Sequence, residues 1–223
     1  MIGDVILIDD YHIEAGNLIL DYLKKINLKT PFAISISGES GCGKTEIGQV
    51  LKNEFGNKGL KVIVLGQDDY FKLPPHSNHE HRNKDISWVG PGEVKLNLLN
   101  EHIKTLKLNN GLLEKPLIHF ENDTIGKEVV TGPFDVIIAE GTYTALLEDV
   151  DVRVFIDRDY KDTKKHRLSR NRDQALEDNE YQDLSFLENV LQIEHKIISQ
   201  HKKLAHLIIP PPAKLMTEDS ISG

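Results

Sequence analysis

The chain has 223 residues, of which 39% are hydrophobic and 28% are charged, proportions typical of a globular protein. Its net charge of −8 argues against a broad nucleic-acid surface, because neutralising phosphates requires clustered Lys and Arg. No apolar run approaches the length of a membrane span, and the N-terminus lacks a basic start followed by an apolar core. The single cysteine excludes an internal disulfide. We therefore expect a cytoplasmic protein that binds neither nucleic acid nor a membrane.

The chain begins with an extension, residues 1–30, ahead of the first core strand. It holds an apolar run at Val5–Ile8, expected to be a strand, and then a helical pattern that ends at Ile26. The extension could pack on the core or build a subunit contact, which leaves a homo-oligomer open. We expect the core domain to span residues 31–212 and residues 213–223 to form a flexible tail.

Strand-like apolar runs alternate with helical patterns in the core domain, which indicates an α/β fold with a parallel sheet and helices on both faces. The expected strands are Phe32–Ser37, Lys61–Leu65, Val136–Ala139, Val152–Ile156 and Leu207–Ile209. A stretch rich in Pro, His and Asn at Phe71–Pro91 predicts a long loop beside the substrate, and residues 184–204 predict a long helix.

One motif follows the first core strand and precedes a helical pattern. It fits G-x-x-x-x-G-K-[ST] in full and consists of Gly38, Glu39, Ser40, Gly41, Cys42, Gly43, Lys44 and Thr45. Glycines let the backbone curl so that its N–H groups point at phosphate oxygens, and the helix N-terminus adds positive potential. Lys44 can then reach the β- and γ-phosphates, and Thr45 can bind Mg²⁺. The motif predicts a nucleoside triphosphate site, with ATP and Mg²⁺ as ligands.

Acidic residues follow three of the expected strands, at the edge where ligands bind in open α/β sheets. Phosphoryl transfer needs one carboxylate to orient the acceptor hydroxyl and another beside Mg²⁺. We assign the base to Asp68, with Asp69 as the alternative, and the metal side to Glu140. Asp157 is interpreted as a cap for the following helix.

A basic cluster at Lys161–Arg172 is expected to form one helix. Arg167 and Arg170 are three residues apart and share a face, so they could close over the transferring phosphoryl group as a lid. Arg172 is a weaker candidate, and a solvated surface helix is the alternative.

Two other patterns favour ordinary structural roles. His76, His79 and His81 have metal-like spacing but lack a supporting ligand framework, so a flexible polar loop is the better interpretation. The Asp123–Gly126 segment has the form D-x-x-G without a guanine-reading partner, which makes a GTPase switch a weak interpretation.

The chain resembles the uridine kinase and phosphoribulokinase family over about Pro31 to Pro210. The segments that carry the resemblance are ISISGESGCGKT, VIVLGQDDYF, DVIIAEGTY, VRVFIDRDYKDTKKHRLSRNRD and HLIIP. The resemblance implies a P-loop NTPase-type sheet with a lid helix and an acceptor loop. It also implies Asp68 as base, Glu140 near Mg²⁺, and Arg167 and Arg170 in the lid.

The acceptor end departs from the family pattern. Uridine kinases carry an aromatic-Asp-Phe segment where this chain has Ile118-His119-Phe120, and an Asp-His-Pro segment where it has Asp85-Ile86-Ser87-Trp88. Asp85, Trp88 and His119 are therefore candidate acceptor contacts. Arg82, Lys84 and His119 are the cations available to an anionic acceptor.

Together these features predict an ATP- and Mg²⁺-dependent kinase that phosphorylates a hydroxyl of a small metabolite, with uridine or cytidine favoured. Pantothenate, glycerate or a sugar phosphate are the alternative acceptors. A regulatory protein that binds ATP without transferring phosphate is the alternative from another functional class.

Overall fold

The computed structural model describes residues 6–108, 112–163 and 184–212, and these form an α/β sandwich around one main sheet. The sheet has five parallel strands in the order β2-β5-β1-β6-β7. Their bounds are β1 Phe32–Ser37, β2 Val62–Gly66, β5 Val136–Glu140, β6 Val152–Ile156 and β7 Leu207–Ile209. The predicted parallel sheet is confirmed, with strand bounds within one residue of those expected from the apolar runs.

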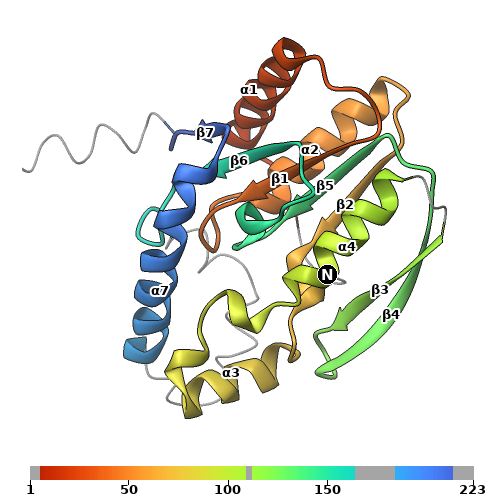
Figure 1. The fold of residues 1–223 in the computed structure, drawn as a ribbon. Helices are drawn as coiled ribbons and strands as arrows, with labels where there is room; N and C mark the ends of the chain where they lie inside the picture. Colours follow the sequence, from red (N-terminus) through yellow and green to blue (C-terminus); the bar gives the residue numbers. More distant parts are fainter. Residues whose placement is uncertain (1–5, 109–111, 164–183, 213–223) are drawn as a thin grey trace, which may run out of the picture.

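Helices cover both faces of this sheet (Figure 1). One face packs against α1 and α2, and the other against α4 and the C-terminal end of α7. The helices are α1 Asp10–Ile26, α2 Lys44–Asn57, α3 Pro75–Lys84, α4 Leu96–Lys107, α7 Leu184–Ile198 and η5 Ser199–Leu204. Among the described residues, no helix is both long and apolar enough to cross a bilayer.

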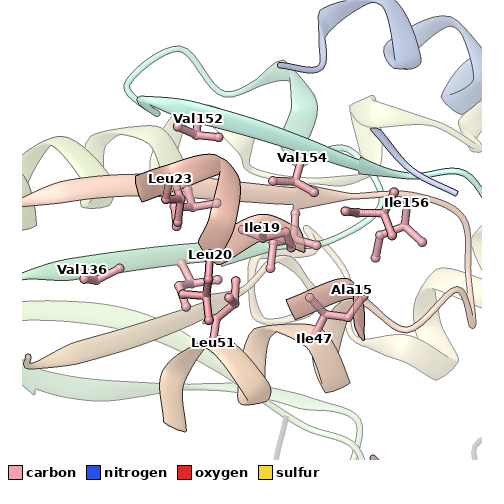
Figure 2. Close-up of a cluster of buried hydrophobic side chains, with 14 of the residues drawn as sticks. Ala15, Ile19, Leu20, Leu23, Ile47, Leu51, Val136, Val152, Val154 and Ile156 are labelled. Atoms are coloured by element: carbon pink, nitrogen blue, oxygen red, sulfur yellow. The ribbon is translucent and has the colours of Figure 1, made fainter. Parts of the chain in front are cut away.

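The core on the α1 face forms because alternate strand residues meet one stripe of each helix. Ile19 and Leu20 of α1 and Leu51 of α2 lie over Val136 and Val154, and all five side chains are buried (Figure 2). Burying each such side chain contributes about 1.5–3 kcal/mol. The helical half of the N-terminal extension is therefore an integral part of the core.

Part of the extension differs from the prediction. The described part of the apolar run Val5–Ile8, residues 6–8, lies outside any strand, and its side chains are exposed. A capping box at Asp9 begins α1 immediately afterwards, and Asp9 accepts a hydrogen bond from the His12 N–H. The expected strand is therefore wrong over residues 6–8.

The expected long loop at Phe71–Pro91 is also wrong, because it contains α3 and a 3₁₀ turn at Ile86–Trp88. Pro75 stands in the first turn of α3, where a missing N–H costs nothing. Asp123 caps this helix from a distant part of the chain, accepting hydrogen bonds from the backbone N–H groups of His76 (2.7 Å) and Ser77 (3.0 Å).

Asp123 belongs to an antiparallel hairpin that the sequence patterns did not predict. Its strands, β3 (Leu112–His119) and β4 (Thr124–Thr131), stand apart from the main sheet. The tip of this hairpin meets α3 near the carboxyl edge of the sheet (Figure 1). The hairpin, α3 and α7 therefore surround the edge at which ligands are expected.

Candidate active site

The phosphate loop connects β1 to α2 with the backbone geometry that anion binding requires. Gly38 has φ 152° and Gly43 has φ 103°, values that favour glycine. A Cβ atom on Gly38 would lie 2.7 Å from Cys42 Sγ, and one on Gly43 would lie 2.7 Å from His12 Nε2. The loop is therefore packed tightly between β6 and α1, and both glycines are sterically required.

Lys44 lies inside this loop. Its ammonium group is largely buried and donates a 2.7 Å hydrogen bond to the backbone carbonyl of Glu39. The amine thus sits among the backbone groups that would surround a bound phosphate. This placement agrees with the assignment of Lys44 as the phosphate-reaching cation.

Thr45 and Glu140 line the same cavity of about 410 Å³ beside the phosphate loop. Glu140 ends β5 and is paired in register with Gly66 of β2 and Ile36 of β1. A hydroxyl and a carboxylate are the hard oxygen donors that Mg²⁺ prefers. The two residues therefore fit a magnesium ion that keeps several water ligands.

Metal sites built from side chains alone are absent from the described ranges. No group of three or more His, Cys, Asp or Glu residues is arranged there to hold a metal ion. The three histidines of α3 are dispersed, since His79 contacts Phe186 and His81 contacts Trp88.

Asp68 and Asp69 occupy one 3₁₀ turn after β2, Gln67–Tyr70, but have different surroundings. Asp69 is buried and lines the cavity; its carboxylate accepts hydrogen bonds from Lys115 Nζ (2.8 Å) and from the Ile118 N–H (3.2 Å). Asp68 is half-buried on the same turn and is not among the residues that line this cavity. Asp69 thus joins the turn to the hairpin.

Lys115 completes the junction between turn and hairpin. Its Nζ also lies 2.9 Å from the Glu128 carboxylate. Burial lowers the pKa of Lys115, but hydrogen bonds and charges from Asp69 and Glu128 outweigh burial, so that the pKa is raised overall. Lys115 is therefore held as a cation, and two carboxylates neutralise its charge.

The three candidate acceptor contacts do not gather in this cavity. Asp85 is exposed and caps the next turn, accepting hydrogen bonds from the Ser87 N–H and hydroxyl. The half-buried Trp88 donates its indole N–H to Asn78 Oδ1 at 2.8 Å. His119 ends β3 at the tip of the hairpin, opposite Thr124.

Two of the three cations proposed for an anionic acceptor, Arg82 and Lys84, already lie beside carboxylates. Arg82 donates two hydrogen bonds to the buried carboxylate of Glu93, at 2.6 and 2.9 Å, and a third to Glu194 at 3.0 Å. Lys84 is exposed and lies 3.9 Å from Glu80.

The predicted lid residues Arg167, Arg170 and Arg172 lie outside the described residues. The segment that precedes them is attached to the phosphate loop. Tyr160 donates its backbone N–H to Glu39 Oε2 at 2.8 Å, and Thr163 donates its hydroxyl to the Ser40 carbonyl at 3.0 Å. No helix begins in residues 158–163, so Asp157 does not cap one among the described residues; its carboxylate pairs with Lys202 Nζ at 2.6 Å.

Sequence patterns missed two sets of contacts to the phosphate loop. Glu39 Oε1 lies 2.7 Å from Nδ1 of His195 on α7, and burial raises the pKa of Glu39 although His195 and the Tyr160 N–H act to lower it. Arg158 donates to the Cys42 carbonyl at 3.4 Å and lies over the Tyr11 ring. No local signal identifies these partners, which come from distant segments.

Comparisons with known proteins agree with this geometry. Residues 33–216 match the model of the phosphoribulokinase/uridine kinase family. A uridine kinase from Latilactobacillus sakei subsp. sakei (strain 23K) is 31% identical over 187 residues, which cover 82% of this chain and 86% of that enzyme. A uridine kinase from Bacillus cytotoxicus is 30% identical, covering 81% of this chain and 85% of that enzyme.

Solved structures share the fold. A possible uridine kinase from Bacillus stearothermophilus superposes with a TM-score of 0.60 at 18% identity, covering 88% of this chain and 97% of that one. D-glycerate 3-kinase from Cryptococcus neoformans superposes with a TM-score of 0.59 at 14% identity, covering 86% and 90%. With a complete phosphate-loop motif on this fold and a family match over most of its length, the chain belongs to the phosphoribulokinase/uridine kinase family of small-molecule kinases.

Proposed function

We propose that this kinase transfers the γ-phosphoryl group of ATP, with Mg²⁺, to a hydroxyl of uridine or cytidine. The observation that carries the proposal is the cavity in which Thr45 and Glu140 meet the carboxyl end of β2. There the phosphate loop, two oxygen donors suited to Mg²⁺ and the turn that bears Asp68 come together at one edge of the sheet. Bound Mg²⁺ would neutralise charge on the transferring phosphoryl group.

The residues of the phosphate loop, the cavity and the turn after β2 have roles that their positions support, whereas the roles of Arg167 and Arg170 follow from their spacing and the family resemblance alone. The loop amides and Lys44 would hold the phosphates, while Thr45 and Glu140 would hold the metal. Asp68 would accept or orient the proton of the acceptor hydroxyl. Arg167 and Arg170 would shield and stabilise the charge of the transferring group.

The charges around the cavity favour a neutral acceptor such as a nucleoside. Asp69, Glu128 and Glu140 line it together with Lys115 and Lys52, so carboxylates outnumber ammonium groups. Lys115 and the nearby Arg82 are each paired with two carboxylates. Among the described residues of this cavity, a sugar phosphate would therefore find a single ammonium group without a carboxylate partner, the exposed Lys52, beside three carboxylates. Relatives named uridine kinase support the same substrate class.

The test is a panel of acceptors assayed for acceptor-dependent ADP release with ATP and Mg²⁺. The panel comprises uridine, cytidine, pantothenate, D-glycerate and a sugar phosphate. We expect the largest kcat/KM with a pyrimidine nucleoside. A larger kcat/KM with D-glycerate or pantothenate would show that this compound is the acceptor, and the proposed mechanism of transfer would still apply. ATP binding without turnover of any acceptor would instead favour the regulatory alternative.

A further inference from the structure

Two consecutive residues of α7 contact opposite sides of the candidate active site. Glu194 accepts a hydrogen bond from Arg82 of α3, and His195 contacts Glu39 of the phosphate loop. Successive residues of an α-helix point about 100° apart, so adjacent positions can reach two different elements. The helix therefore connects the loop predicted to hold nucleotide with the helix beside the hairpin.

At the phosphate loop, the contact between His195 and Glu39 involves a residue whose backbone is part of the phosphate-binding loop. The side chain of Glu39 binds His195 on α7 and the backbone N–H of Tyr160, and its own carbonyl accepts the hydrogen bond from Lys44. His195 also stands edge-on to the Tyr160 ring, with ring centres 5.7 Å apart. Any rearrangement of the loop around a triphosphate would therefore be transmitted to α7.

At the α3 end, the contact continues into a buried polar network. Arg82 binds Glu93, which is fully buried and accepts further hydrogen bonds from Asn78 Nδ2 (2.6 Å) and from the Gly90 N–H (2.7 Å). Asn78 in turn accepts the indole N–H of Trp88. An unbroken series of side-chain contacts thus leads from α7 to the indole.

Charge links the two ends as well. Burial raises the pKa of Glu194, whereas Arg82 and, at longer range, Lys44 act to lower it. The phosphates of a bound nucleotide would offset the positive charge of Lys44 and so change the potential at Glu194. Arg82 is shared between Glu194 and Glu93, so its position depends on both carboxylates.

We infer that Glu194 and His195 are positioning residues that couple nucleotide binding at the phosphate loop to the arrangement of α3 on the acceptor side. This coupling rests on the proposed kinase function, because phosphoryl transfer requires the bound nucleotide and the bound acceptor to be correctly placed relative to each other. Such coupling is reciprocal: if nucleotide shifts α3, an acceptor held beside α3 changes nucleotide affinity by the same factor.

Trp88 reports on this coupling without any acceptor. It is the single tryptophan of the chain, and it lies at the α3 end of the network. Titration with the non-hydrolysable analogue AMP-PNP and Mg²⁺ should change its fluorescence in the native protein. Glu194→Gln and His195→Ala should each lose most of that change, while calorimetry shows that the analogue still binds.

Matched variants separate coupling from general damage to α7. Glu188→Gln makes the same chemical change at an exposed position of α7 and should behave like the native protein. His195→Gln keeps a hydrogen-bond donor for Glu39 and should restore part of the signal. Thermal unfolding midpoints close to the native value would confirm that Glu194→Gln and His195→Ala remain folded.

Two results would overturn the inference. One is the absence of any Trp88 response in the native protein at saturating AMP-PNP, and the other is a full native response in both Glu194→Gln and His195→Ala. Failure of the proposed function would look different, because it would appear as bound nucleotide with no acceptor turned over. The fluorescence titration needs no acceptor, so it tests the coupling whether or not the proposed kinase function holds.

Discussion

At the scale of single residues, two neighbouring carboxylates have distinct surroundings. Asp69 is buried against Lys115 and the backbone of the hairpin, while Asp68 is half-buried on the same turn. Breaking a buried hydrogen-bonded pair destabilises the fold, whereas removing a general base slows turnover. The two aspartates should therefore respond differently to the same substitution.

Asp68→Asn is expected to lower kcat by at least about 100-fold, because proton transfer by a positioned carboxylate contributes roughly 10²–10⁴-fold. ATP affinity and stability should stay near native values. Asp69→Asn should lower the free energy of unfolding by about 1–3 kcal/mol, because a buried partner of Lys115 is weakened. Initial rates, calorimetric titration and urea unfolding measure these effects. The reverse pattern would make Asp69 the base.

Cys42 should be a poor nucleophile. It is fully buried in the phosphate loop, and burial raises the pKa of its thiol although Lys44 and Arg158 act to lower it. Because the thiolate is the reactive form, the native protein should react with iodoacetamide much more slowly than the urea-unfolded chain. Equal rates in both states, followed by mass spectrometry, would show instead that the thiol is accessible and the loop is open.

At the scale of elements, the contact between hairpin and α3 depends on one carboxylate. Asp123 accepts hydrogen bonds from two N–H groups at the start of α3 and from the Ser77 hydroxyl at 2.6 Å. Burial acts to raise the pKa of Asp123, but the Ser77 and His76 contacts outweigh burial and lower the pKa.

Asp123→Ala should therefore lower the free energy of unfolding at pH 7 by about 1 kcal/mol, the usual cost of losing a helix cap. Because the folded pKa is depressed, the stabilisation is present above the unfolded pKa of about 3.9 and is lost as pH falls through the folded value. Urea unfolding at pH 7 and near pH 3 tests this. The exposed Glu121→Ala serves as control; an undiminished difference at pH 3 would contradict the assignment.

The sheet could be predicted from sequence because its strands are short, mainly apolar runs, and the central strands β1 and β5 are almost wholly buried. Strands Phe32–Ser37, Val152–Ile156 and Leu207–Ile209 begin and end where their apolar runs do. The helix α3 could not be predicted, because it is polar on most sides and its cap comes from Asp123. Strand β3 was missed because Lys115 and Pro116 interrupt its pattern.

The same distinction holds for the site. The phosphate loop is a local motif, so its residues could be identified along the chain, and the structure places them between β1 and the first turn of α2. The contact between Glu39 and His195 joins positions 156 residues apart and follows only from tertiary packing. Asp85 stays a prediction as an acceptor contact, since its carboxylate caps a local turn and is not among the residues that line the cavity.

At the scale of the whole molecule, α1 joins the N-terminal extension to the phosphate loop. Tyr11 lies under Arg158 and donates its hydroxyl to the Pro210 carbonyl at 3.3 Å, while His12 lies against Gly43. Helix α1 thus contacts both the loop and the segment after β7. The helix should therefore unfold together with the kinase core.

Ile19→Ala tests this cooperativity. Ile19 is fully buried between α1 and the sheet, so truncating it should lower the free energy of unfolding by about 2–5 kcal/mol. Urea unfolding should remain a single transition at a lower midpoint, and the exposed Leu18→Ala should change little. A separate early transition would show instead that α1 unfolds independently of the core.

The most direct test of the central claim follows the phosphoryl group itself. Wild-type protein and Asp68→Asn would be incubated with γ-³²P-labelled ATP, Mg²⁺ and uridine or cytidine, and the products separated. We predict labelled nucleoside monophosphate from the wild-type protein and at least about 100-fold slower formation by Asp68→Asn. Label released only as inorganic phosphate, or equal rates of nucleotide formation by both proteins, would contradict the account.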